Sequence, residues 1–388
     1  MVQISSDMKQ VTIHTPNIGE DTDLNKVSYK VMSKCRYIPE KWIDKVTDAL
    51  KELQLRNRNK NNDFDDDRSD ISNDEERTSS QLETFLELLY SNDVDKQSAL
   101  KGILALCMET RNLELILNDH PLISALSRIL SDQGSNSRKI VFSVVKVFLA
   151  FSEFDDFHQN LSKYRIGALV VATVDLETRR AEQIERDALT DNKNWQRNGL
   201  NKRNENIMFF CFQFLLRISD SASVMHKMLK KKLAQMLFKA LRSSSKRLLD
   251  CVLIIMIRAS IYKEVVDEMR KCTNSIQLLV RLLSVDDKTI PMNTLRVLFN
   301  LSFDSGNLLN MMKAGIISML AKNSRRLMKR KCHFFGILYH MSSLDEIRNS
   351  NIFDSLTPFI VQYVLTSSRE GINTELAAFL INVSAFPL

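Results

Sequence analysis

Apolar side chains recur at intervals of three and four residues along most of this chain, the spacing that lines one face of an α-helix. Within this pattern a short phrase returns: two mostly apolar residues, a variable residue, another apolar residue and a serine. Its clearest copies occupy residues 298–302, 338–342 and 380–384. The variable middle residues of all copies, looser ones included, are Ala105, Ala150, Arg217, Arg258, Asn300, His340 and Asn382. With one exception they follow one another at steps of about 42 residues, which predicts repeated helical units.

A helical repeat of this length is typical of armadillo and HEAT solenoids, in which stacked units bury one continuous core. We predict an all-α protein: an armadillo-repeat solenoid, forming a right-handed superhelix of about seven units, with a helical N-terminal segment. The chain has only 9 glycines among 388 residues, and none stands in a phosphate-binding motif. This scarcity argues against an α/β nucleotide-binding enzyme. We expect no enzymatic activity, because no nucleophile has a recognisable base in its motif context.

Three stretches are expected along the chain. Residues 1–56 are interpreted as an N-terminal helical segment, residues 57–80 as an acidic flexible linker, and residues 81–388 as the solenoid. The linker assignment rests on the loss of the apolar pattern in a run of Asp, Glu, Asn and Ser, which cannot bury enough surface to fold. The one long step between phrases indicates a charged insertion at about 175–204. We expect this insertion to extend the second helix of its unit and to project from the stack.

Charge is unevenly distributed along the chain. The formal net charge is +7, yet residues 1–80 hold 13 Lys and Arg against 16 Asp and Glu, so the positive surplus lies in the predicted solenoid. A basic body favours an acidic partner. Neither the six cysteines nor the six histidines have the spacing of a metal site, so we expect no metal and no cofactor. We also expect no membrane insertion and a cytoplasmic location, because no apolar run spans a bilayer and no secretory signal opens the chain.

Four phrases go beyond the general repeat pattern. They are Phe-Ser-Glu-Phe-Asp-Asp-Phe-His ending at residue 158, Lys-Tyr-Arg-Ile-Gly-Ala-Leu ending at 169, Leu-Phe-Asn-Leu-Ser-Phe-Asp ending at 304 and Ile-Leu-Tyr-His-Met-Ser ending at 342. In these phrases, and over most of residues 23–388, the chain resembles the kinesin-associated protein family, the non-motor accessory subunits of heterotrimeric kinesin-II. Members of that family are considerably longer, and no polar cap follows the last phrase. We therefore expect either a shortened member or part of a longer chain.

The resemblance implies a scaffold that joins a heteromeric complex. Its partners would be the kinesin-II motor subunits and cargo adaptors, and its role would lie in microtubule-based transport, including transport in cilia. The implied location is cytoplasmic and microtubule-associated, at the cilium or axoneme. The alternative is a nuclear-import-type or other armadillo adaptor that binds acidic or extended peptides. The import type places Trp four residues before the groove Asn, where this chain has Arg296 and Ala378.

The middle residues of the phrases are the candidate binding residues. We single out Arg217, Arg258, Asn300, His340 and Asn382, whose side chains would contact a partner in the groove of an armadillo stack. The other interpretation is that they hydrogen-bond the helix ends of a neighbouring repeat. Three basic clusters, at 227–232, 242–247 and 325–331, are either solvated helix ends or a surface for an acidic partner. Nucleic acid is not expected, because no stacking aromatics are interleaved with these charges.

Overall fold

The computed structural model describes residues 24–34, most of 43–51, 67–132, 137–190, 194–348, 351–366 and 372–384. Within these ranges the chain forms helices and their connections, with no strand. It divides into two compact units, Met1–Gln81 and Leu82–Leu388. In the first unit, α1 (Leu24–Lys34) packs on helical residues between 43 and 51, where Val27 and Leu50 are buried together. The apolar spacing of the N-terminal segment thus produces a small core of its own.

Helix α3 (Asp67–Leu89) begins inside the segment expected to be a flexible linker. The linker prediction therefore differs from the structure over residues 67–80, while residues 57–66 lie outside the described part of the chain. Loss of the apolar pattern did not end the helix. The reason is that α3 continues into Leu82 and Leu89, which are buried in the solenoid core, and lengthening an existing helix costs far less than starting one.

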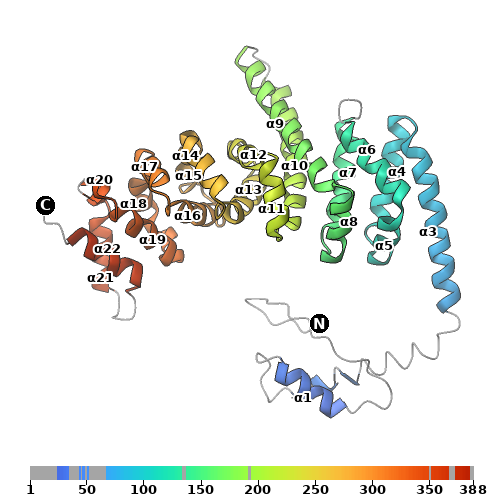
Figure 1. The fold of residues 1–388 in the computed structure, drawn as a ribbon, viewed down its shortest axis with the longest axis horizontal. Coiled ribbons are helices and arrows are strands. Elements are labelled where there is room, and N and C mark those ends of the chain that lie inside the picture. The colour runs from blue at the N-terminus through green and yellow to red at the C-terminus, as the bar shows by residue number, and fades with distance from the viewer. Residues whose placement is uncertain are drawn as a thin grey trace. The chain divides into compact units, whose positions relative to one another are not determined.

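The second unit is built from a repeated set of three helices, seen as a series from α4 to α22 in Figure 1. The third helix of each set ends in the sequence phrase. The third helices are α4 (Asp93–Leu106), α7 (Arg138–Phe151), α10 (Asn194–Ile218), α13 (Lys246–Ala259), α16 (Ile290–Leu301), α19 (Lys331–Ser342) and α22 (Thr374–Ser384). Each of them contacts the next in this order, so the middle residues of the phrases form one column along the stack. We call these seven residues the column residues.

The first and second helices of the sets lie beside the third helices. The first helices are α5 (Thr110–Asn118), η2 (Asp155–Phe157) with α8 (His158–Lys163), α11 (Ala222–Lys230), α14 (Lys263–Lys271), α17 (Ser305–Lys313) and α20 (Asp345–Arg348) with η4 (Asn351–Phe353). The second helices are α6 (His120–Ser131), α9 (Ile166–Thr190), α12 (Leu233–Ala240), α15 (Thr273–Leu282), α18 (Ile316–Leu327) with η3 (Met328–Arg330), and α21 (Thr357–Thr366).

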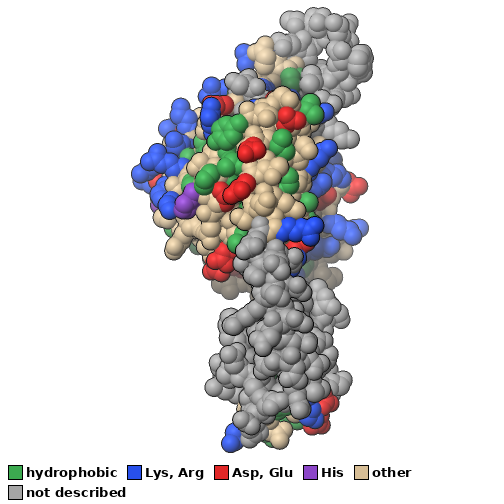
Figure 2. Space-filling view, turned by 90° about the vertical axis from the view of Figure 1, so that its right-hand side faces the viewer, with side chains coloured by type: hydrophobic (Ala, Val, Ile, Leu, Met, Phe, Trp, Pro, Cys, Tyr) green, Lys and Arg blue, Asp and Glu red, His purple; other side chains and the backbone are tan. Residues whose placement is uncertain are grey.

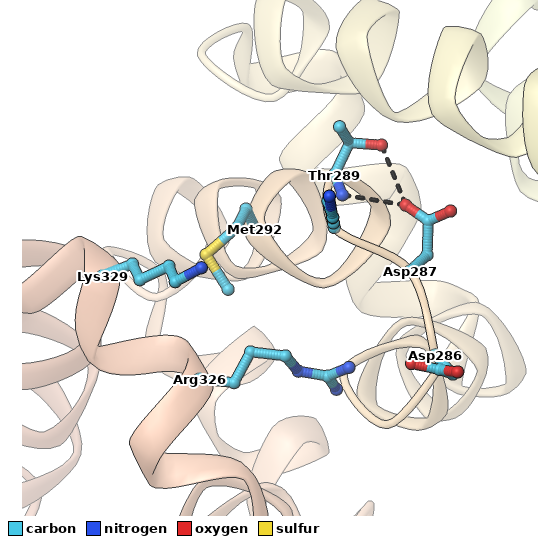
Figure 3. A pocket seen from close by; sticks show the side chains of 7 residues that line it. Asp286, Asp287, Thr289, Met292, Arg326 and Lys329 are labelled. Atoms are coloured by element: carbon cyan, nitrogen blue, oxygen red, sulfur yellow. Dashed lines mark hydrogen bonds between the residues drawn. The ribbon is translucent and has the colours of Figure 1, made fainter.

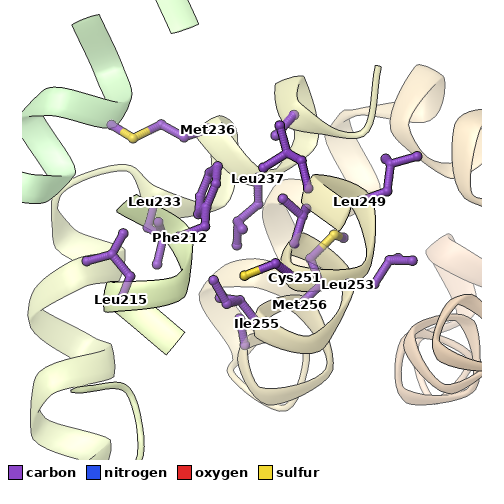
Figure 4. Close-up of a cluster of buried hydrophobic side chains, with 14 of the residues drawn as sticks. Phe212, Leu215, Leu233, Met236, Leu237, Leu249, Cys251, Leu253, Ile255 and Met256 are labelled. Atoms are coloured by element: carbon purple, nitrogen blue, oxygen red, sulfur yellow. The ribbon is translucent and has the colours of Figure 1, made fainter. Parts of the chain in front are cut away.

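One continuous apolar core runs through the described part of the second unit. Figure 4 shows a section of it, where Phe212 and Leu215 of α10 meet Leu237 of α12 and Leu253 and Met256 of α13. Each of these side chains is almost wholly buried. Because every repeat completes the core of its neighbour, stability is shared between repeats rather than held by any one of them.

The predicted insertion is a helical hairpin. Helices α9 and α10 are 25 residues each and extend beyond the neighbouring helices (Figure 1). We had expected the insertion to project from the stack from about residue 175 onward. Its base is instead buried, since Glu177 is only 1% exposed. Arg138 and Arg180 both donate to its carboxylate, and Asn204 Nδ2 donates to its carbonyl oxygen at 2.9 Å. The base of the hairpin therefore belongs to the core.

The turn into the second helix recurs in three repeats with a left-handed residue. Arg165, Lys232 and Gly315 have φ values of 56°, 63° and 77°, and each stands directly before a second helix. Gly315 stands between the end of α17 and the start of α18. An L-residue at such a φ pays a steric cost that glycine avoids. The backbone shape of this turn is thus kept even where the sequence supplies arginine or lysine.

Candidate partner-binding face

The exposed side chains of the third helices form a surface that we call the third-helix face. The serine of the phrase closes the end of every third helix except α4, which carries Cys107 at that position. Its hydroxyl donates to the carbonyl three residues earlier, as Ser260 does to Ile257 at 3.1 Å and Ser302 to Phe299 at 2.6 Å. Such a bond pairs one of the carbonyls that a helix end leaves without an intrahelical donor. The serine oxygen then remains available as an acceptor.

The column residue of the next repeat uses that acceptor. Asn300 Nδ2 donates to Ser260 Oγ at 2.9 Å and to the Ile257 carbonyl at 3.1 Å. Asn382 Nδ2 donates to Ser342 Oγ at 3.1 Å. His340 Nδ1 lies 2.7 Å from Ser302 Oγ, and because that hydroxyl already donates to a carbonyl, Nδ1 carries the proton. We call this series of bonds between repeats the ladder.

The two column arginines join the ladder through ion pairs as well. Arg258 Nη1 donates to Ser219 Oγ and to the Leu216 carbonyl, both at 2.8 Å, and lies 2.6 Å from Asp220. Arg217 Nη2 donates to Glu153 Oε1 at 3.0 Å. The side chains of Arg217 and Arg258 are 41% and 38% exposed, so both guanidinium groups also face solvent. They are held in place without being buried.

These contacts answer part of the question that the sequence left open. Asn300, His340, Asn382 and both column arginines bond a neighbouring repeat, as one of the two interpretations expected. Contact with a partner stays a prediction for all five. Ala105 and Ala150 have no polar group to contribute, so the ladder runs from α7 to α22 within the described residues.

Aromatic and apolar side chains stand beside the ladder. Phe303 and Ile261 occupy the same position in successive repeats, three residues after the column residue, and are 70% and 72% exposed. The ring of His340 lies 4.4 Å from that of Phe303 and 5.6 Å from that of Phe299. Burial lowers the pKa of His340, so the ring is neutral near pH 7. Exposed apolar groups in register with arginines suit a partner that is both acidic and apolar.

Sequence reasoning missed these apolar positions. They follow the serine of the phrase, where the other repeats carry Met108, Glu153, Asp220 and Ser343, so no shared residue type marks the site. These positions could have been found only by their place directly after the phrase serine, and not by the type of residue that they carry.

Charged side chains are spread over the described surface. Figure 2 shows Lys and Arg side chains along both flanks of the described surface that it presents, with several Asp and Glu between them. No group of three or more His, Cys, Asp or Glu among the described residues is arranged to hold a metal ion. None of the described helices is long and apolar enough to cross a membrane.

Stacked helix triplets sharing one core define an armadillo-repeat solenoid, a non-catalytic scaffold type of protein. The sequence model of the kinesin-associated protein (KAP) family matches residues 6–386, nearly the whole chain. This chain belongs to the kinesin-associated protein family.

Solved structures with a similar fold are designed armadillo repeat proteins. One is the designed protein YIII(Dq)4CqI, with 13% sequence identity and a TM-score of 0.48, covering 66% of this chain and 99% of that one. Another is YIII(Dq.V1)4CPAF in complex with the peptide (KR)4, with 13% identity, a TM-score of 0.47 and the same coverage. A set designed for modular peptide recognition has 13% identity and a TM-score of 0.49, again over 66% and 99% of the two chains.

Proposed function

We propose that this chain is the accessory subunit of a kinesin-II motor, binding the motor subunits and linking them to cargo adaptors. Membership of the kinesin-associated protein family supports this role, and the rigid solenoid suits it. The transport would run along microtubules, including those of the ciliary axoneme, and the protein would be found there and in the cytoplasm.

The observation that carries the binding part of the proposal is the state of Arg217 and Arg258. Each guanidinium is oriented by bonds to a neighbouring repeat, yet each remains partly exposed. A guanidinium has five N–H donors, and its bonds to the neighbouring repeat use only one nitrogen of each arginine, so donors remain for a partner. Because the arginines are already ordered, a partner carboxylate pairs with them at a small entropic cost.

We include Asn300, His340 and Asn382 in the same binding surface. They continue the line of Arg217 and Arg258 along the ladder, and Phe303 and Ile261 supply apolar contact area beside them. The fitting partner is an extended or helical tail segment that carries carboxylates and apolar side chains. Several contacts of this kind in register add specificity and speed encounter, even though each exposed ion pair contributes only about 1 kcal/mol or less.

The test asks whether a partner's carboxylates compete with Glu153 and Asp220 for the two column arginines. Glu153→Gln and Asp220→Asn remove the intramolecular competitors and should tighten binding of the motor tail segments by roughly threefold to tenfold, because the freed guanidinium pairs only with the partner. Arg217→Gln with Arg258→Gln should weaken it by at least about tenfold. Binding is measured by titration of labelled tail segments at several salt concentrations. Unchanged, salt-insensitive affinity in all three variants would place the motor elsewhere.

A matched control comes from an exposed pair away from this face. Arg111 and Glu109 form an ion pair at 2.9 Å near the start of α5, and Arg111→Gln removes the same charge. Its effect on tail binding should stay within about twofold.

A further inference from the structure

The basic cluster at 325–331 gathers charge that the ladder does not use. Arg326 is committed to the fold, since its guanidinium donates to the carbonyls of Leu283 and Val285 at the end of α15. Arg330 and Lys329, in the short helix η3, form no ion pair with any described residue. They face α16, which carries Met292 and, one turn later on the same side, Arg296.

Arg296, Arg330 and His333 converge on one place. Burial lowers the pKa of the Arg296 guanidinium, and the nearby charge of Arg330 lowers it further. Burial also lowers the pKa of His333, with Arg330 and Arg296 adding to the effect. Their placement agrees with this, because Arg296 lies three residues before Phe299 on α16, His333 lies three residues after Arg330, and the rings of Phe299 and His333 are 4.9 Å apart. Among the described residues, the carboxylate that raises the pKa of His333 is that of Glu375 in α22, and no ion pair there joins Glu375 to Arg296 or Arg330.

The ring of Phe299 and a surface cavity adjoin this cluster. The ring of His333 meets Phe299 edge-on at 4.9 Å, and Phe299 lies so close over Gly336 that a Cβ there would come within 2.5 Å of it. A surface cavity of about 560 Å³ lies alongside, lined by Lys288, Thr289, Met292, Arg326 and Lys329 together with Asp286 and Asp287. Figure 3 shows Lys329 beside Met292 and Arg326 directed toward the loop that carries Asp286.

Asp287 does not neutralise this cluster. Its carboxylate accepts hydrogen bonds from the backbone N–H groups of Thr289 and Ile290 and from the Thr289 hydroxyl, which together lower the pKa of Asp287. These bonds hold it at the start of α16. A partly buried arginine beside a second arginine, with no carboxylate paired to either, is an unfavourable arrangement that an anion would relieve.

We propose that Arg296, Arg330 and His333, with Lys329 at the edge, bind a phosphorylated serine or threonine in a partner protein. Two arginines, with a histidine that an adjacent dianion would protonate, match a compact group with three acceptor oxygens, whereas a single carboxylate would compensate only one arginine. The dianion restores the charged form of His333, and the cavity receives the residues that flank the phosphate. This site adjoins the proposed binding surface at His340, since Phe299 contacts both histidine rings, but it lies on other helices than Arg217 and Arg258 and does not depend on them.

The experiment measures retention of the full 388-residue chain on immobilised degenerate peptides with a fixed central phosphoserine. A twin library carries serine at that position, and a third carries glutamate. We expect at least about tenfold stronger retention on the phosphoserine library than on either twin. Equal retention on the phosphoserine and glutamate libraries would overturn the proposal, because it would indicate a general acidic-peptide surface. Equal competition by a short RNA would overturn it as well, by showing an unselective polyanion surface.

Variants locate the site. Arg330→Gln should remove the preference for phosphoserine, while Arg325→Gln, an exposed arginine of the same cluster, should keep it. Glu375→Gln should strengthen retention, because it removes the competing carboxylate. An equal loss in Arg325→Gln and Arg330→Gln would refute a defined site. Arg217→Gln with Arg258→Gln should leave the preference intact, so failure of the motor-binding proposal and failure of this one are distinguishable. Circular dichroism confirms that each variant is folded. Arg330→Lys keeps the charge without the planar guanidinium, so it should show only part of the preference for phosphoserine that Arg330→Gln loses.

Discussion

Removing one rung of the ladder should weaken the solenoid by a predictable amount, and Asn300→Ala is the cleanest way to do it. The Asn300 side chain makes two hydrogen bonds to the preceding repeat, at 2.9 and 3.1 Å. A net contribution of about 1 kcal/mol for each bond gives about 2 kcal/mol. The Ile257 carbonyl keeps its bond from Ser260, so no carbonyl is stranded. Alanine also favours the helix over asparagine by about 0.5 kcal/mol. The expected net loss is therefore about 1–1.5 kcal/mol.

The assay is urea unfolding followed by circular dichroism, with hydrogen exchange at the end of α13 as a local measurement, because repeat arrays need not unfold in one step. Ser260→Ala and the double variant complete a cycle whose coupling energy should be about 1 kcal/mol. Asn274→Ala is the control, since Asn274 is exposed and bonded to no described side chain, and its effect should stay within about 0.5 kcal/mol. Additive single variants, or a loss in Asn300→Ala no larger than in the control, would refute the ladder as a stabilising device.

Three further predictions concern other parts of the solenoid. Lys232→Gly should raise the free energy of unfolding by about 1 kcal/mol because it relieves a left-handed backbone, whereas Lys231→Gly, at φ −87°, should lower it; equal effects would contradict the strain argument. Glu177→Ala should cost about 3 kcal/mol in urea unfolding, because it leaves two arginines without their carboxylate; a neutral result would mean that water replaces it. The folded-state pKa of His340 lies below 6.5, so as pH falls through 6.5 the unfolded chain binds protons first and stability drops. The urea concentration at the unfolding midpoint should therefore decrease as the pH is lowered from about 7.5 to about 5.5, and it should decrease less steeply in His340→Gln. An identical slope would exclude His340 as a cause.

The repeat architecture could be predicted because the phrase carries its physical cause. An apolar spacing of three and four residues places one helix face in the core, and the serine closes the helix end, so both recur wherever the third helix recurs. The hydrogen bond between Asn300 and Ser260 could also have been predicted from the sequence. A polar middle residue in one copy follows a serine in the copy before it, and stacked repeats bring such positions together.

Other features depended on contacts that no local pattern reveals. The sequence around Glu177 looks solvated because it is charged, yet Arg138, 39 residues earlier, pairs with that carboxylate and allows its burial. Residues 67–80 lack an apolar face and were expected to be a linker, but they continue a helix that is anchored further along at Leu82 and Leu89. The convergence of Arg296 with Arg330 likewise arises from packing between repeats. In each case a distant part of the chain decides the outcome.

The ladder also has a mechanical meaning. Every rung joins only two neighbouring repeats, so a pull along the array would load all junctions in series with the same force, and the array would part where resistance is lowest. Between α4 and α7 the column residue is Ala150, whose methyl group can donate no hydrogen bond, and that junction relies on apolar packing alone among the column contacts. Under tension, that junction would resist through its packed core without a hydrogen-bonded rung. The repeats from α10 onward, tied by arginine, asparagine and histidine, would stay together as one stiff tether.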